Sequence, residues 1–303
     1  MAGDEGGVPG IDRALLWAYL GHPADEPRER RRVLYGLVAL RLGLGLSFAL
    51  RGWGALFAAP PGALASRLGD LGALGLASGP GADMALFVFG CTEILVGLFF
   101  ICGAFSRLAA SVAGVLLALY LVRGIHAPLV VAAELALLGG ALVVVVCGGP
   151  FLSADRFLDK VEEEERDRAP AVLPAAGTLT PLCPRLGLAA GLGWLAADLA
   201  GGGLGGAIAP GAASLALAAG AVALALALLA GVWTRAAGPL GALLLAGLGL
   251  ALGQGAVLVA GLAGVAVSLA LTGAGTASVA ALRAGRSAGR EDAAPAEGLT
   301  APR

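Results

Sequence analysis

The chain alternates long apolar segments with short polar gaps from residue 33 to residue 272. Most of the apolar segments approach the roughly 20 residues that an α-helix needs to cross a bilayer core, and the shorter ones are expected to extend into their flanks. This pattern predicts an all-α integral membrane protein. Its eight expected spans are 33–52, 84–104, 108–122, 129–148, 185–200, 212–232, 237–252 and 256–272.

The basic residues fall almost entirely in alternate gaps between these spans. If the N-terminus is placed on one side of the membrane, that side collects 16 lysine and arginine residues, and the other side receives only Arg51, Arg67 and Arg123. Arg41 lies inside the first span. Because basic residues near span ends set orientation, we predict a multi-pass protein of the cell (inner) membrane with the N-terminus and C-terminus both cytoplasmic.

Composition agrees with a membrane protein. Hydrophobic residues make up 58% of the chain and charged residues only 14%, against about 25% charged in soluble domains. The net charge of −1 gives no reason to expect nucleic acid as a partner, whereas lipid contact is expected. The first 32 residues lack the apolar stretch of a signal peptide, so the first span is expected to anchor the protein.

The polar segments divide the chain into five predicted parts. Gly148-Gly149-Pro150 is expected to end the fourth span, and the Pro-rich stretch that follows is not expected to continue a helix. The predicted parts are a cytoplasmic N-terminal arm (1–32), a four-helix membrane bundle (33–158), a charged and then Pro/Ala-rich cytoplasmic linker (159–184), a second four-helix bundle (185–280) and a disordered cytoplasmic tail (281–303).

The two membrane regions look alike. Residues 103–109 read Gly-Ala-Phe-Ser-Arg-Leu-Ala and residues 231–237 read Gly-Val-Trp-Thr-Arg-Ala-Ala, so each places a glycine, an aromatic, a hydroxyl and an arginine at one turn. Arg41-Leu42-Gly43-Leu44 likewise matches Arg185-Leu186-Gly187-Leu188. An internal duplication is predicted, and four spans per repeat make the two bundles parallel rather than inverted.

The first of these regions resembles the DoxX family of four-helix bacterial membrane proteins over about residues 33–158, and a weaker likeness covers 185–280. The residues that carry the resemblance are Arg41 with its Leu-Gly-Leu, Gly52-Trp53, Glu93 with Gly97 and Gly103, the turn Phe105 to Ala110, Glu134, and the segment Gly148 to Asp155. The resemblance implies a four-helix fold. It also implies an association with membrane redox modules, including a quinone-linked thiosulfate-oxidising system.

The chain departs from this family in three places. Ala55 and Leu56 stand where a lysine is usual after the Gly-Trp pair. In the second half, Ala221 lies opposite Glu93, and Leu262 lies opposite Glu134 in the alignment that matches Arg107 with Arg235. Any chemistry that the two acids perform is therefore expected in the first half only.

Three ionisable residues are predicted to form an intramembrane polar site: Arg41, Glu93 and Glu134. Arg41 and Glu93 lie about 12 and 14 Å from opposite membrane faces along their helices, so we expect them to meet near the midplane. Ionisable residues at such depth are costly and suggest function. The alternative that stays open is an ion pair that only holds the helices in register.

Arg51, Arg123 and His126 are expected near the outer boundary, close to Glu134, and could form a polar vestibule. Protonation of Glu134 or His126 could accompany binding of a quinone head group or another small polar molecule, because groups in an apolar pocket have readily shifted pKa values. The alternative is a ring of side chains that extend to the interface.

Other cofactors are not expected. His22 and His126 are the only histidines, which argues against a bis-histidine haem, and no metal-ligand spacing occurs. The four cysteines form no Cys-x-x-Cys motif, and Cys91 and Cys102 are too far apart on one helix for a disulfide. No covalent or metal cofactor is predicted, and a quinone is the one small molecule that the resemblance suggests.

Three functions remain open. The favoured one is an accessory or anchoring subunit of a quinone-linked membrane redox complex, which has protein partners and is not catalytic alone. The second is a small-solute or proton-coupled carrier that uses Arg41 and Glu93. The third is a scaffold or assembly factor that presents Gly-rich helix faces to partner subunits.

Overall fold

The computed structural model describes residues 27–58, 82–123, 128–147, 176–201, 211–252, 256–273 and 278. These residues form eight α-helices and one π-helical turn, with no strand among them. The elements are α2 (Pro27–Trp53), η1 (Gly54–Ala58), α4 (Ala82–Cys102), α5 (Ser106–Arg123), α6 (Pro128–Cys147), α8 (Ala176–Ala200), α9 (Ala212–Ala230), α10 (Thr234–Ala251) and α11 (Ala256–Thr272). We call α2 to α6 the first half and α8 to α11 the second half.

The all-helical class predicted from the apolar pattern is confirmed. Four of the described helices are long and apolar enough to cross a membrane, at Arg32–Phe57, Pro128–Cys147, Ala212–Ala230 and Thr234–Ala251. Three shorter apolar stretches lie at Phe87–Cys102, Ser106–Val122 and Val257–Thr272. Much of the predicted N-terminal arm, most of the linker and the C-terminal tail lie outside the described residues, as does the segment Gly148 to Asp155.

α8 differs from its prediction because it begins at Ala176, nine positions before the predicted start of the fifth span. It therefore includes Pro181 and Pro184, which were predicted to belong to a non-helical linker. The two prolines cannot donate backbone hydrogen bonds to the carbonyls four residues earlier. They are the sixth and ninth residues of α8, beyond the first four positions whose N–H groups have no helical partner, so the carbonyls of Gly177 and Thr180 lose their usual helical donors.

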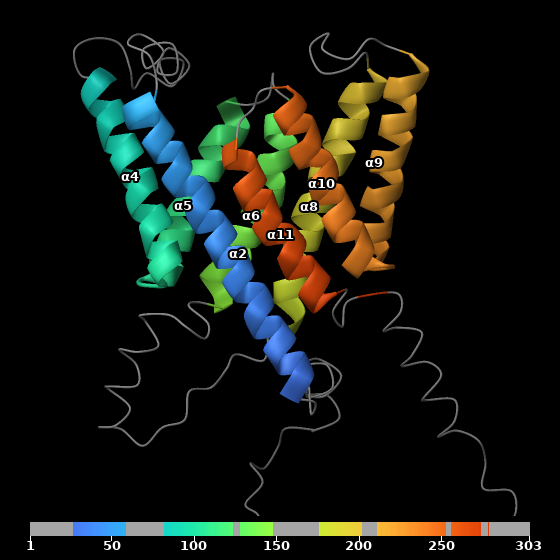
Figure 1. The fold of residues 1–303 in the computed structure, drawn as a ribbon, viewed down its shortest axis with the longest axis horizontal. Coiled ribbons are helices and arrows are strands. Elements are labelled where there is room, and N and C mark those ends of the chain that lie inside the picture. The colour runs from blue at the N-terminus through green and yellow to red at the C-terminus, as the bar shows by residue number, and fades with distance from the viewer. Residues whose placement is uncertain are drawn as a thin grey trace, which may run out of the picture.

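The helices alternate in direction, so that α2 begins and α11 ends at the same end of the molecule (Figure 1). The two halves meet along two helix pairs, α2 with α11 and α6 with α8, and these are the most extensive helix contacts. Figure 1 shows α6 and α11 near the middle of the molecule, with α4 on one flank and α9 on the other. Each half thus contacts the other through its first and last helices.

Glycine allows these two contacts to be very close. A methyl group at Gly43 of α2 would lie 2.6 Å from the Cα atom of Gly264 of α11. On the other side, a methyl group at Gly187 of α8 would lie 2.5 Å from the carbonyl oxygen of Leu135 and 3.1 Å from the Cα atom of Gly139, both on α6. In each contact the glycine lies against the Cα atom of a second glycine and the carbonyl oxygen four residues before it. The two halves therefore meet in nearly the same way at both places.

Small residues also line the contact between the first two helices of each half. A methyl group at Gly52 would lie 2.6 Å from the carbonyl oxygen of Gly90, and one at Gly97 would lie 2.7 Å from that of Gly45. When α8 is aligned on α2 and α9 on α4, these four glycines correspond to alanines, and all four alanines are buried. They are Ala189, Ala196, Ala218 and Ala225.

The turn that joins the second and third helices is the same in both halves. Gly103 and Gly231 have φ values of 69° and 67°, and Phe105 and Trp233 have φ values of 49° and 51°. The amide of Ala109 donates to the carbonyl of Phe105, as that of Ala237 donates to the carbonyl of Trp233. Glycine is needed at the first position because an L side chain is strained at positive φ.

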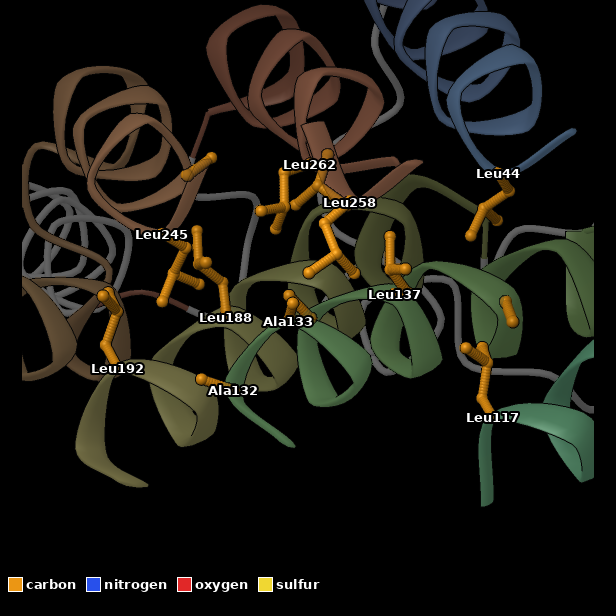
Figure 2. Packing of buried hydrophobic residues seen from close by; sticks show 14 of the residues in the cluster. Leu44, Leu117, Ala132, Ala133, Leu137, Leu188, Leu192, Leu245, Leu258 and Leu262 are labelled. Carbon is orange, nitrogen blue, oxygen red and sulfur yellow. The ribbon is translucent and has the colours of Figure 1, made fainter. Parts of the chain in front are cut away.

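One hydrophobic core runs through both halves. Figure 2 shows Leu258 and Leu262 of α11 close to Leu137 of α6 on one side and to Leu188 and Leu245 of the second half on the other. All five side chains are buried. The polar groups of the first half are therefore held by a structure that includes the second half.

We predict that Gly43→Ala will destabilise the protein while Gly193→Ala will not. The added methyl at Gly43 meets the backbone of α11, and overpacking of this kind costs about 1–3 kcal/mol. Gly193 lies on an exposed part of α8 with no atom within 4 Å of an added methyl, where alanine favours a helix by up to about 1 kcal/mol. Thermal unfolding in a mild detergent measures both effects, and equal midpoints would contradict the close contact.

Candidate functional site

Four polar side chains, one from each helix of the first half, form a linked cluster. Arg51 of α2 donates to Glu134 of α6, with Nη2 2.6 Å from Oε1 and Nη1 3.4 Å from Oε2. The phenol of Tyr120 on α5 donates to Oε1 of Glu93 on α4. A two-point contact between guanidinium and carboxylate is among the stronger hydrogen-bonded pairs in proteins. We call these four residues the polar cluster.

Aromatic rings join the two hydrogen-bonded pairs. The guanidinium carbon of Arg51 lies 4.4 Å from the centre of the Tyr120 ring and 5.7 Å from that of Phe48. The ring of Phe89 packs edge-on against Tyr120 with centroids 5.9 Å apart. A cation over an aromatic face is attracted by the ring, so Tyr120 contacts Arg51 with its face and Glu93 with its hydroxyl.

The two carboxyl groups of the polar cluster are almost completely buried, and Arg51 and Tyr120 are partly buried. Glu93 and Glu134 are each 1% exposed, and the side chain of Arg51 is 13% exposed. A charge in an apolar surrounding is tolerated only when it is paired and hydrogen-bonded. Arg51 pairs with Glu134 and hydrogen-bonds it, and Tyr120 supplies a hydrogen bond to Glu93.

Contacts between α2 and α4 explain why Glu93 lies beside Arg51. Gly90 contacts Gly52, and Gly97 contacts Gly45 and Ala49. Because the two helices are antiparallel, the stretch of α2 opposite Glu93 lies between Ala49 and Gly52, and it contains Arg51. The glycines therefore set the height at which the polar residues meet.

Arg41, which was predicted to pair with Glu93, lies ten positions before Arg51 on α2, a separation of about 15 Å along the axis. It is buried, with 2% exposure. An Arg41–Glu93 pair stays a prediction, and the alignment of α2 with α4 favours Arg51 as the cation nearest Glu93. Arg185 is the counterpart of Arg41 in the second half and is also 2% exposed. Its Nη1 atom lies at the Gly231 turn, 2.7 Å from the position of an added methyl group there.

The other predicted site residues have different outcomes. Arg51 was assigned to an outer vestibule, and the structure shows it bonded to Glu134, which was assigned to the intramembrane site. Arg123 ends α5, but its side chain and the whole of His126 lie outside the described residues. Tyr120 was missed. The available signal was a phenol in an otherwise aliphatic stretch, three residues before Arg123.

The second half has apolar residues at the corresponding positions. Leu195 and Ala221, which correspond to Arg51 and Glu93, are fully buried, and Leu248 corresponds to Tyr120. The sequence comparison placed Leu262 opposite Glu134, whereas the matched contacts of Gly43 with Gly264 and of Gly187 with Gly139 place Val259 there. Either residue is apolar, so the polar cluster has no equivalent among the described residues of the second half.

The polar cluster can bind and exchange protons and can hydrogen-bond an oxygen-bearing head group. It combines a phenol donor, two carboxyl groups and a guanidinium within aromatic walls. The described residues contain no group of three or more His, Cys, Asp or Glu that could hold a metal ion. The four side chains of the polar cluster themselves offer proton transfer and hydrogen bonding.

We predict that Arg51→Met and Glu134→Leu will each destabilise the protein. The double variant should lose less stability than the sum of the losses in the two single variants. Breaking a buried ion pair by removing one partner costs about 3–5 kcal/mol because the other charge is left alone, whereas an apolar pair is tolerated. The second half already has apolar residues in this arrangement. Thermal unfolding of the three variants forms a double-mutant cycle, and additive losses would show that the two residues are not coupled.

Comparison with known proteins supports the resemblance of the first half. The model of the DoxX family matches residues 36–124. This range includes two thirds of α2, all of α4 and α5, and three members of the polar cluster, Arg51, Glu93 and Tyr120. Searches of curated proteins and of solved structures found no match. Residues 36–124 are therefore identified as a DoxX-like region of a membrane protein.

Proposed function

We propose that this protein is an accessory or anchoring subunit of a quinone-linked redox complex in the cell membrane, with no redox centre of its own and both termini in the cytoplasm. The observation that carries the proposal is the polar cluster of Arg51, Glu93, Tyr120 and Glu134, three members of which lie in the DoxX-like region. The DoxX family is often associated with redox functions, and this cluster is the feature of the first half best suited to such a role.

The cluster fits the needs of a quinone head group. A quinone carries two carbonyl oxygens, and its reduction to a quinol adds two protons as well as two electrons. Tyr120 can donate a hydrogen bond to a carbonyl oxygen, and the two carboxyl groups can hold protons within the apolar region. The electrons would come from a partner subunit.

We further propose that the second half is a duplicate of the first that lost its polar cluster and kept its structural role. The matched glycine contacts and the two turns with the same φ values support a common origin. Two parallel four-helix units would then associate within one chain as two subunits associate in a dimer. The second half would support α2 and α6, which carry Arg51 and Glu134.

The other two functions have less support. A carrier needs polar groups along a path between the two membrane faces, and the four linked residues occupy one level of the first half. A scaffold would present its small-residue faces to partners, but Gly43, Gly139, Gly187 and Gly264 lie in contacts within the chain. The accessory function therefore remains the proposal.

We predict that the protein, extracted from its native membrane in a mild detergent, will retain quinone and a stoichiometric redox enzyme. Mass spectrometry of the bound lipids and of the co-purifying proteins measures both. Tyr120→Phe, which removes the phenol that donates to Glu93, should lower the retained quinone by about tenfold, as expected for loss of one good polar contact. The partner should remain bound because the substitution keeps the aromatic ring and removes only a hydroxyl.

A matched control lies in the second half. Leu248→Met changes the counterpart of Tyr120 without altering polarity, so it should leave both quinone and partner at wild-type levels. A wild-type preparation free of both quinone and redox partner would contradict the proposed function.

A further inference from the structure

The helix pair α4 and α5 is the natural place to look for access to the polar cluster. These two helices are joined by a short turn, yet they contact each other much less than α2 contacts α4 or α5 contacts α6. Their counterparts α9 and α10 behave in the same way. The α4–α5 boundary is therefore the least closely packed contact between chain neighbours in the first half.

Two of the four polar side chains of the cluster meet at this boundary. Glu93 comes from α4 and Tyr120 from α5, and their hydrogen bond crosses from one helix to the other. Phe89, one turn before Glu93, packs its ring against Tyr120 across the same boundary. The bond between Arg51 and Glu134, in contrast, joins α2 to α6, so it lies on the inner side of the cluster.

One face of α4 contacts no other described helix and adjoins this boundary. On α4, Gly90 and Gly97 face α2, Phe89 and Glu93 face α5, and Leu95 is 52% exposed on the remaining face. Thr92 is partly exposed, and helical geometry places it next to Glu93 on the lipid side of the α5 contact. A lipid-soluble molecule that enters between α4 and α5 would therefore pass Thr92 before it reached Glu93 and Tyr120.

We propose that a quinone with an apolar tail reaches the polar cluster sideways from the bilayer, between α4 and α5. A carbonyl oxygen of its head group would accept hydrogen bonds from the hydroxyl of Tyr120, which would leave Glu93, and from Glu93 in its protonated form. Its tail would remain among the apolar side chains at the lipid face. This inference rests on the proposed function, and it adds the route and the two residues that receive the ligand. No covalent bond is made or broken in this binding step.

The second half indicates why only one such site is expected. The boundary between α9 and α10 has the same loose contact, but Ala221 and Leu248 stand at the positions of Glu93 and Tyr120. Neither side chain can hydrogen-bond. A head group at that boundary would lose its bonds to water without replacement, so one ligand per chain is expected.

Thr92→Trp tests the route, and Leu95→Trp is its matched control. Both variants add an indole near the middle of α4, but only the first is placed at the α5 boundary. The probe is a benzoquinone with a decyl tail, and the measurement is the shift of the thermal unfolding midpoint with its concentration, which reports binding to the native state. Thr92→Trp should weaken apparent binding by about tenfold or more, and Leu95→Trp should stay within about twofold of wild type.

Photolabelling gives an independent measurement on the wild-type protein. An azido-substituted benzoquinone with the same tail should label residues near Glu93 and near Tyr120, and excess decyl benzoquinone should prevent this. Labelling confined to α2 and α6, or to the second half, would overturn the route. This result does not depend on whether Thr92→Trp folds.

The outcomes separate the two proposals. If wild type binds the quinone and Thr92→Trp binds it equally well, with no label on α4 or α5, the route is wrong and the proposed function stands. If wild type shows neither a quinone-dependent shift nor protected labelling, the quinone site itself is wrong, and the route is lost with it. Tyr120→Phe, which removes one hydroxyl, should weaken binding by about tenfold if the head group bonds there.

Discussion

Close backbone contact at glycine is the constraint on which the rest of this structure depends. Within lipid there is no hydrophobic force between helices, so association depends on close packing and on hydrogen bonds between polar groups. Gly45, Gly52, Gly90 and Gly97 bring α2 and α4 together and thereby fix their relative heights. That alignment places Glu93 beside Arg51. The polar cluster is thus a result of where the glycines are.

The two halves show that this framework and the polar chemistry can be separated. Alanines replace the four glycines in the second half and remain buried, and the Gly103 and Gly231 turns have the same φ values. The polar cluster is present only in the first half of the described chain. The second half therefore keeps the same helix contacts without the polar cluster. The buried ion pair between Arg51 and Glu134 needs an explanation beyond stability, since such pairs are often no more stabilising than apolar ones.

Much of the fold follows from sequence patterns, because length and hydropathy decide which segments are helical. The similar turns were also predictable, since glycine followed by an aromatic residue, a hydroxyl and an arginine occurs twice. The start of α8 was not, because two prolines argued against a helix that the structure continues through. A proline predicts the loss of a backbone hydrogen bond within its own helix. It does not predict the tertiary contacts, such as those of α8 with α6, that can keep the segment helical.

The candidate site was predictable in its residue types but not in its pairing. Glu93 and Glu134 stood out as acids in apolar spans, and Arg51 was expected near Glu134, but the bond between Arg51 and Glu134 and the bond from Tyr120 to Glu93 were not predicted. Pairing depends on helix rotation and on relative height, and one residue of error changes the facing direction by about 100°. The sequence comparison made the same kind of error when it placed Leu262 opposite Glu134, because the matched glycine contacts place Val259 there. The two positions differ by three residues, which is nearly one helical turn.

The contact between α2 and α11 has a consequence for biogenesis. α2 is the first described helix to be synthesised and α11 the last, so the Gly43 face of α2 cannot be covered by its own partner until almost the whole chain has been made. Until then, that face is open to lipid or to the insertion machinery. Completion of the last helix therefore closes the molecule, and a chain that stops after α10 would leave its first helix without its principal neighbour.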